Sequence, residues 1–439
     1  MNKKLNLAVA AALALGATAA QAGIVIPAGD WTVDINGNVN AFYIYNDSSD
    51  ANVVSGGLAN TAGNNGSGSS SINTGLLPSW LGITGKKREN NLDISWTISF
   101  QPGASSKAGL GGGSGGGSEH RQANLTFGDK SWGSVKVGLD LGVFGANAIL
   151  NDQTLLGVGS QGAVGTRGGS TTTLGRIGTG FLYADFTGQI NYTTPDFNGF
   201  QATAGIRQPW GSTNLAGALS RTIADNQDTP GIEGVVSYSW AGDFSGKAWV
   251  EGMHQDVQSP AIAAGFAPGV FSSVTGLTSA ASATAAAAAI NDSADVFGIG
   301  ASVNFAGFNV VGYYYTGEGV GTTGILSDGF AASGASRDSD GGYVQGKYKL
   351  PTGTTIGASW GISNLDLASG ETLVAATAGT ATATTGNLVK SNEMWTVGAY
   401  HPLTSNLNLV AEYSKVTSEN QSGQENESDI FDIGAILFF

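Results

Sequence analysis

The sequence has no cysteine and only three histidines, and these absences exclude several kinds of site. A chain without cysteine forms neither disulfide bonds nor thiolate metal sites. His120, His254 and His401 lie far apart along the chain, so a histidine-rich metal site is not expected. Residues 338–341 (DSDG) resemble the start of a calcium loop but lack the glutamate that such a loop requires. We therefore predict no cofactor and no metal site.

Charged residues are scarce and biased toward one sign. They make up 12% of the chain, with 33 acidic against 19 basic residues, whereas an average soluble domain has about 25%. An acidic chain offers few cations to replace the counterions of phosphate groups, so we do not expect nucleic-acid binding.

Long apolar runs are also missing, apart from the N-terminal segment. A membrane-spanning helix needs about 18 or more apolar residues, and nothing after residue 22 approaches this. The N-terminus has Lys3 and Lys4, then mostly apolar residues 5–20, then Ala20-Gln21-Ala22, which is typical of a secretory signal peptide. We predict a cleaved signal peptide over residues 1–22 and a single exported domain over residues 23–439.

Aromatic residues and a regular alternation of apolar and polar residues are what the sequence does contain. Its 9 Trp, 12 Tyr and 18 Phe argue against the disorder that 69 Gly would otherwise suggest. From Trp31 to Tyr45 apolar residues fall mostly on one face and polar residues on the other. Residues 92–100 repeat the pattern, and residues 431–439 begin with it. A period of two residues indicates strands with different surroundings on their two faces.

The length and spacing of these strands favour a membrane barrel over a soluble sandwich. They are about 9–12 residues long and begin or end in aromatic residues, as membrane strands with interfacial girdles do, while sandwich strands are usually nearer 5–6 residues. We predict sixteen strands, near residues 30–45, 79–86, 91–101, 120–128, 133–142, 187–195, 199–208, 232–240, 246–255, 296–305, 308–317, 341–350, 354–363, 393–402, 407–416 and 428–439. Seven short connections alternate with eight long ones, the pattern of periplasmic turns and extracellular loops. The predicted fold class is all-β, a transmembrane antiparallel β-barrel of about 16 strands.

Several motifs follow one another in a recognisable order. They are residues 121–127 (RQANLTF), 133–138 (GSVKVG), 192–200 (YTTPDFNGF), 396–400 (TVGAY), 409–415 (LVAEYSK) and the terminal Phe439. In this order the chain resembles the Gram-negative trimeric porins, in the branch common among β-proteobacteria, over essentially all of residues 23–439.

The resemblance implies a location, an assembly and a set of partners. It implies a homotrimer of water-filled barrels in the Gram-negative outer membrane, in contact with membrane lipid and lipopolysaccharide. The barrel-assembly machinery would recognise the C-terminal Phe439. The third loop, about residues 143–186, would fold inward and narrow each pore.

Departures from the family pattern concern the charges of the pore. The opening of the third loop, residues 142–145 (GVFG), lacks the acidic residue that the family usually has there. Trp80, Leu139 and Asn191 stand where the family often has arginine. The resemblance therefore suggests a lumen that attracts anions less than usual.

The period of two also identifies the lumen-facing charges, because the face opposite the lipid lines a wide barrel. The predicted lumen acids are Asp34, Asp93, Asp140, Glu233, Glu251, Glu412 and Asp432. The predicted lumen bases are Lys136, Arg207, Lys247, Lys347 and Lys349. The loops add further acids, at Asp225, Asp228, Glu318, Asp328, Asp338, Asp340, Glu419, Glu425 and Glu427. An excess of acids concentrates cations, which suggests weak cation preference or tolerance of neutral solutes.

The constriction should involve charged residues in or beside the third loop. These candidates are Asp140, Asp152, Arg167, Arg176, Asp185 and Arg207. The wider set of lumen candidates adds Lys136, Asp34, Asp93, Glu251, Lys347 and Lys349. Each could contact a passing solute, or form an ion pair that anchors the loop inside the pore.

A passive diffusion channel for small hydrophilic solutes and ions is the function that these features predict. The alternatives are a channel specific for a sugar or organic acid and a barrel that serves adhesion or binding. No enzyme is predicted: the G-x-S-x-G patterns at residues 112–116 and 357–361 lie in a glycine run and in a predicted strand, not on the strand-to-helix turn that exposes a nucleophile. The G-x-G-x-x-G pattern at residues 157–162 has no βαβ context.

Overall fold

A computed structural model describes most of the chain after residue 22. The described residues are 23–50, 52–59, 68–104, 118–161, 172–211, 223, 227–261, 288–375 and 384–439, with short strand pieces between 265 and 284. The predicted signal peptide and the predicted constriction residue Arg167 lie outside the described residues. Removal of residues 1–22 therefore stays a prediction.

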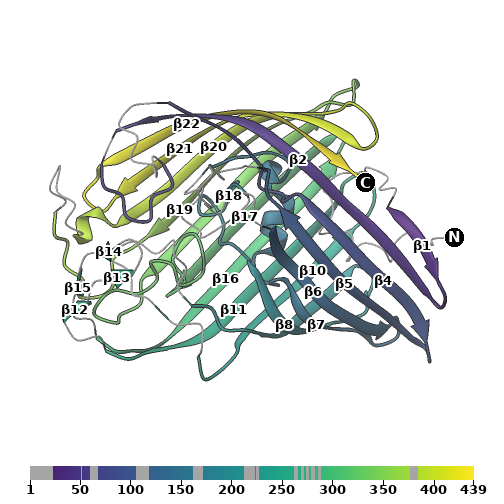
Figure 1. The fold of residues 1–439 in the computed structure, drawn as a ribbon, viewed down its shortest axis with the longest axis horizontal. Helices are drawn as coiled ribbons and strands as arrows, with labels where there is room; N and C mark the ends of the chain where they lie inside the picture. The colour runs from purple at the N-terminus through teal and green to yellow at the C-terminus, as the bar shows by residue number, and fades with distance from the viewer. Residues whose placement is uncertain are drawn as a thin grey trace.

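Long antiparallel strands close into a barrel (Figure 1). In the described part of the chain the wall consists of β2 (Trp31–Ser49), β4 (Trp80–Glu89), β5 (Leu92–Pro102), β6 (Ser118–Asp129), β7 (Gly133–Leu141), β8 (Phe186–Thr193), β9 (Phe200–Arg207), β10 (Gly231–Trp240), β11 (Ser245–Ser259), β16 (Ile290–Phe305), β17 (Phe308–Glu318), β18 (Asp338–Lys349), β19 (Thr355–Leu365), β20 (Val389–Pro402), β21 (Leu407–Asn420) and β22 (Glu425–Phe438). The barrel closes where β22 pairs with β2, from Phe438 opposite Asn38 to Glu427 opposite Ser49. These sixteen strands confirm the predicted barrel.

Short strands extend or accompany this wall. β2 is longer than its pairing with β22 on one side and with β4 on the other. β1 (Ile24–Ala28) and β3 (Ser69–Asn73) pair with the parts of β2 that these two neighbours leave free. Two small hairpins lie between β11 and β16: β12 (Gly265–Ala267) pairs with β15 (Ser282–Thr284), and β13 (Phe271–Ser272) pairs with β14 (Gly276–Leu277).

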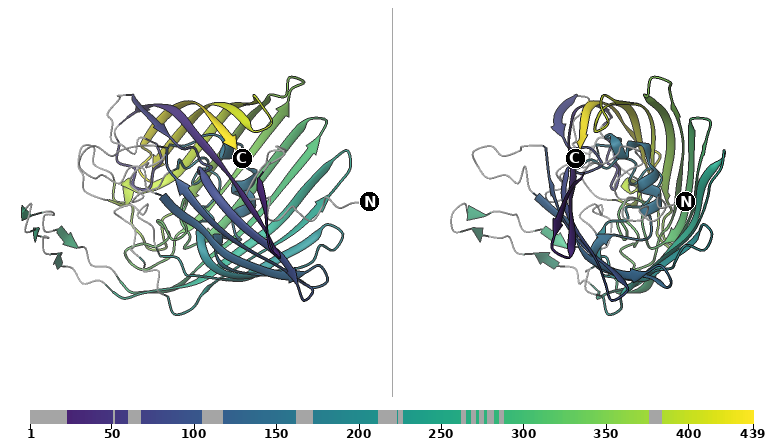
Figure 2. Two further views of the ribbon diagram at one scale, coloured as in Figure 1. Left: turned by 45° about the vertical axis from the view of Figure 1, so that its right-hand side comes forward. Right: turned by 90° about the vertical axis from the view of Figure 1, so that its right-hand side faces the viewer.

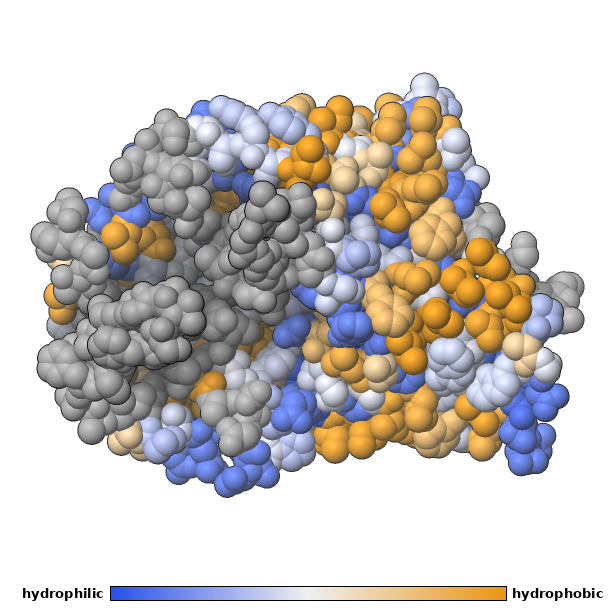
Figure 3. All heavy atoms as spheres, in the orientation of Figure 1, coloured by the Kyte–Doolittle hydropathy of each residue, from blue (hydrophilic) through white to orange (hydrophobic). Residues whose placement is uncertain are grey.

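Alternation along each strand separates an apolar outer face from an inner face. On β2, Val39 is 59% exposed while its neighbours Asn38 and Asn40 are buried. In the view of Figure 3, apolar side chains gather over the half of the barrel that carries the short turns. Aromatic rings cluster near these turns, with Tyr238 packed between Phe200 and Trp240. This is the surface that lipid requires of a barrel.

The turns at one end of the barrel are short because their residues adopt turn conformations readily. Asn90 and Asn91 connect β4 and β5 with φ of 48° and 64°, the left-handed values of a tight hairpin turn that asparagine tolerates. At the other end, the last predicted long loop is shorter than predicted. β21 and β22 continue to Asn420 and from Glu425. Beyond the lipid a strand needs hydrogen-bond partners but no apolar outer face, so polar residues extend it.

Helices are few. α1 (Ala146–Asn151), the 3₁₀ helix η1 (Gln153–Leu156) and the 3₁₀ helix η2 (Thr385–Asn387) are those of the described residues. Within that part of the chain, none of the helices has the length and apolar character needed to cross a membrane.

Candidate functional site

The third loop (residues 142–185, between β7 and β8) folds into the barrel, as predicted. Figure 2 shows its α1 and η1 segment within the ring of strands. The first part of the loop is held by two inward-facing carboxylates. Glu233 on β10 accepts a hydrogen bond from the backbone N–H of Phe144 at 3.1 Å, and Glu251 on β11 accepts one from Gly145 at 3.1 Å. These acids therefore anchor the loop to the wall.

A third carboxylate holds the loop on the far side of the barrel. Glu412 on β21 accepts hydrogen bonds from the backbone N–H groups of Val158 at 2.8 Å and Gly159 at 3.0 Å, and from the Tyr400 hydroxyl at 2.6 Å. The loop approaches so closely that a Cβ at Gly157 would lie 2.1 Å from the carboxyl carbon of Glu412. Only glycine fits there.

Arg176, one of the predicted constriction residues, is enclosed within the loop and the wall. Its side chain is fully buried and lies 3.8 Å from Asp152, another candidate. It donates hydrogen bonds to the Met394 carbonyl at 2.9 Å and to the Ser359 hydroxyl. Asp152 also caps η1 by accepting from the Thr154 N–H at 3.0 Å. In this arrangement both residues act as anchors.

Arg207 lies next to Glu233, the residue that holds the start of the third loop. Its guanidinium is stacked on Trp210, with 3.2 Å between its carbon and the ring centroid, and is 3.7 Å from Glu233. Trp210 belongs to the loop after β9. Its backbone N–H donates a hydrogen bond to the Gln255 side chain on the wall at 2.8 Å. The side chain of Arg207 is buried.

Other candidates form a second group along β7 and the base of the loop. The Lys136 ammonium lies 2.5 Å from Asp140, which also accepts from Gln122 at 2.9 Å. The carbonyl of Asp185 accepts from the Gly142 N–H at 2.8 Å, which closes the base of the loop. Lys136 is about one-third exposed, whereas Asp140 is buried.

Asp34, Asp93 and Lys349 lie apart from the constriction, near the short turns, whereas Lys347 lies beside Gln153 of η1 in the third loop. Asp93 pairs with Arg88 at 2.7 Å, and both side chains are about half exposed. Asp34 accepts a hydrogen bond from the side chain of Asn36 at 3.2 Å. On β18, Lys347 is partly buried and Lys349 is exposed.

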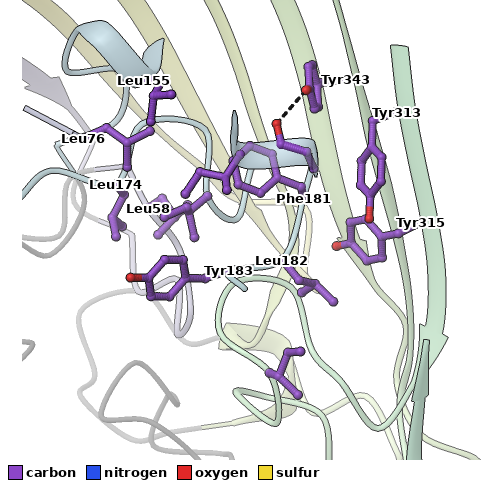
Figure 4. Close-up of a cluster of buried hydrophobic side chains, with 14 of the residues drawn as sticks. Leu58, Leu76, Leu155, Leu174, Phe181, Leu182, Tyr183, Tyr313, Tyr315 and Tyr343 are labelled. Atoms are coloured by element: carbon purple, nitrogen blue, oxygen red, sulfur yellow. Dashed lines mark hydrogen bonds between the residues drawn. The ribbon is translucent and has the colours of Figure 1, made fainter. Parts of the chain in front are cut away.

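A large apolar cluster inside the barrel was not predicted. Figure 4 shows buried side chains from the third loop, among them Phe181 and Leu182, facing the wall residues Tyr313 and Tyr343. The Tyr343 hydroxyl donates to the Ala148 carbonyl of α1 at 2.8 Å. The loop between β17 and β18 (residues 319–337) joins the same cluster through Ile325. The apolar residues within 319–337 were the sequence signal that could have predicted this cluster, because a loop exposed to water outside the cell needs no large apolar side chains.

Burial divides the predicted lumen charges unequally. Of the seven acids, Asp140, Glu233, Glu251, Glu412 and Asp432 are at most 3% exposed. Of the five bases, Arg207 is buried, while Lys136, Lys247, Lys347 and Lys349 keep some exposure. Four bases and two acids therefore keep some exposure, the reverse of the excess counted from sequence, although Lys247 also donates a hydrogen bond to the side chain of Asn147 in the third loop at 2.6 Å.

Comparisons with known proteins agree with this architecture. Residues 8–421 match the family model described as Gram-negative porin. The outer membrane channel DcaP of Acinetobacter baumannii is similar in structure, with a TM-score of 0.59, 13% identity, and coverage of 95% of this chain and 99% of that one. OmpF of Salmonella typhi, in complex with daunomycin, gives a TM-score of 0.53 and 13% identity over 95% of this chain and 100% of that chain. No curated protein matches the sequence. The barrel, its inward third loop and the family match together identify the chain as a member of the Gram-negative porin family, outer-membrane proteins that form diffusion channels.

Proposed function

We propose that this porin lets small hydrophilic solutes and ions diffuse passively along one side of its lumen. The observation that carries this proposal is the fixed position of the third loop. Its contacts with Glu233, Glu251 and Glu412 tie it to the wall between β10 and β21. The inner face of β4 to β9 carries polar side chains that keep some exposure, among them Thr84, Thr97 and Thr203. A polar, hydrated wall suits hydrophilic solutes.

Weak ion selectivity belongs to the same proposal. The accessible lumen charges, four bases against two acids, favour anions slightly in place of the weak cation preference suggested by the residue count. Acids near the outer ends of the strands, such as Glu318, Asp338 and Glu425, act in the opposite direction. Opposing fields in series leave neutral solutes unhindered. The alternative that the sequence left open, a channel specific for one sugar or organic acid, is not supported by any contact among the described residues.

A homotrimeric assembly with lipid and assembly-factor partners completes the proposal. OmpT of Vibrio cholerae, solved in a trimer form, has a TM-score of 0.53 to this chain at 14% identity, covering 93% of it and 99% of that protein. Phe439 lies beside the barrel seam, where its carbonyl accepts from the Gly37 N–H at 2.8 Å. Recognition of this residue by the barrel-assembly machinery, and contact with lipopolysaccharide, rest on family membership.

Planar bilayer recording of the purified protein tests the function directly. Conductance steps in groups of three, with a reversal potential near zero or slightly anion-favouring in a salt gradient, are the expected result. A strongly cation-favouring potential would contradict the charge assignment and keep the channel. A folded, heat-modifiable barrel without conductance would contradict the diffusion function itself.

A further inference from the structure

The loop between β17 and β18 (residues 319–337, the second inward loop) enters the barrel interior, although its position in the chain predicts an extracellular loop. Val320, Ile325, Leu326 and Phe330 are each at most 2% exposed. They belong to the same buried cluster as Phe181 of the third loop. A loop that buries four large apolar side chains inside a barrel excludes water from the space it fills.

The second inward loop docks directly onto the third loop. The backbone N–H of Tyr183 donates to the Thr323 carbonyl at 2.9 Å, and Tyr183 and Gly324 form a parallel bridge. The second inward loop is itself tightly folded, since a Cβ at Gly321 would lie 1.5 Å from the Ser327 carbonyl oxygen. The two loops therefore form one continuous body across the lumen.

One arginine connects the second inward loop to a neighbouring loop. Arg337 is fully buried, and its Nε and Nη2 donate to the two carboxyl oxygens of Glu371 at 3.0 and 2.6 Å. Its Nη1 donates to the Asp328 carbonyl at 2.9 Å, across the base of the loop. Glu371 lies in the loop between β19 and β20 and also accepts from the Ala368 N–H at 3.0 Å. We call these contacts the Arg337 clamp. A bidentate arginine–carboxylate pair fixes geometry as well as charge.

We propose that the second inward loop is a second constriction element of the pore, held in place by the Arg337 clamp, and that it sets the size limit for solutes together with the third loop. This rests on the proposed diffusion function. β17 and β18 stand across the barrel from β5 and β6 in the strand order, so the second inward loop occupies the side opposite the polar wall. Its removal from the lumen would widen the path from that side. Arg337 acts as a positioning residue and has no contact with a solute in this scheme.

Arg337→Ala and Glu371→Gln test the clamp in planar bilayers and in liposome swelling with sugars of graded size. We expect about twofold higher single-channel conductance and entry of larger sugars, because conductance follows the width of the pore. Lys390→Ala is the matched control, because it breaks an ion pair with Glu419 (2.8 Å) on the exposed outer face. Unchanged conductance and size limit in both clamp variants would overturn the proposal.

A disulfide lock separates loop release from general damage. The chain has no cysteine, so Tyr183→Cys with Gly324→Cys introduces a single pair across the bridge between the two loops. In the Arg337→Ala background, oxidation should restore the wild-type conductance and size limit, and reduction should abolish this rescue. Failure of the oxidised pair to restore them would overturn the proposal.

The yield of this disulfide also reports the loop position without any conductance. It should form readily with Arg337 present and several-fold more slowly with Arg337→Ala. Equal yields would overturn the clamp. A silent wild-type channel with normal cross-linking would instead refute the diffusion function, and the constriction with it, while the loop contact stayed intact.

Discussion

At the scale of single residues, several of the charges that the sequence assigned to the pore hold the third loop. Glu233, Glu251 and Glu412 face inward as the alternation predicts, but each accepts a backbone N–H of the loop. A buried carboxylate is costly unless donors satisfy it, and orphan amides of an irregular loop are suitable donors. Each of these carboxylates therefore supplies an acceptor to a loop amide that would otherwise lack one.

Gly157→Ala should displace the third loop from the wall. The added Cβ would meet the Glu412 carboxylate at 2.1 Å, and that carboxylate is fixed by Tyr400 and two loop amides. We expect higher and noisier single-channel conductance. Gly346→Ala is the control, because its Cβ would enter open space on the outer face. Wild-type recordings from Gly157→Ala would show that the contact does not position the loop.

Arg176→Met should destabilise the barrel more than the loss of an outer ion pair does. It leaves Asp152 and two hydrogen-bond acceptors buried without their partner, and breaking a buried pair typically costs about 3–5 kcal/mol. Lys415→Met removes an outer pair with Glu427 (2.9 Å), for which roughly 0–1 kcal/mol is expected. Urea unfolding in liposomes, followed by tryptophan fluorescence, measures both. Equal midpoints for the two variants would refute the anchoring role.

At the scale of elements, several loops and the wall of strands make one packed interior. The third loop supplies α1, η1 and apolar residues such as Phe181 and Leu182, and the second inward loop supplies Ile325 and its neighbours. Leu58 and Leu76, from the loop between β2 and β4, join the same cluster (Figure 4). Contacts between loops far apart in sequence make their positions interdependent. Breaking the Arg337 clamp should therefore shift the third loop as well as the second inward loop.

Acid should release the second inward loop. Burial raises the pKa of Glu371, but the hydrogen bond and charge of Arg337 and the Ala368 N–H outweigh it, so this pKa is lowered from its usual 4.5. A lowered folded-state pKa means that the clamp contributes fully above the unfolded value and is lost as the pH falls through the folded value. We expect wild-type conductance to be constant near neutral pH and to rise only once the pH falls below the ordinary glutamate pKa.

Arg337→Ala provides the comparison for this pH effect. Its conductance should already be high at neutral pH and should lack the acid-dependent rise, because the pair no longer exists to titrate. A wild-type acid response that persists unchanged in Arg337→Ala would assign the effect to other groups.

At the scale of the whole molecule, ion selectivity follows from the charges that remain accessible. The three lysines Lys247, Lys347 and Lys349 face the lumen on β11 and β18 and keep some exposure. Fields from such charges act over a Debye length of about 8–10 Å, comparable to a pore radius. The selectivity should therefore depend on these lysines.

The triple change Lys247→Gln, Lys347→Gln and Lys349→Gln should shift the reversal potential toward cations. The expected change in the permeability ratio is about two- to threefold at low salt and should shrink at high salt, as screening requires. Lys390→Gln with Lys415→Gln, on the outer face, is the control. A reversal potential that does not move in the triple variant would locate selectivity elsewhere.

The alternation of apolar and polar residues was enough to predict the barrel. The number of strands and the inward or outward direction of most side chains follow from a period of two, because the lipid and the lumen impose opposite demands on neighbouring residues. The resemblance of the motifs also predicted the inward third loop correctly. The features of the strands are local, so a pattern within about ten residues carries them, whereas the inward loop was predicted only by the resemblance.

Which of the inward charges meet water depends on how the loops fold over the wall. Glu412 and Lys347 look alike in the alternation, yet the first is enclosed by the third loop and the second keeps exposure. The partners of Arg337 and Tyr183 lie in other loops, at Glu371 and Thr323. Burial beneath a loop depends on contacts between segments far apart in the chain, and no local pattern records such contacts.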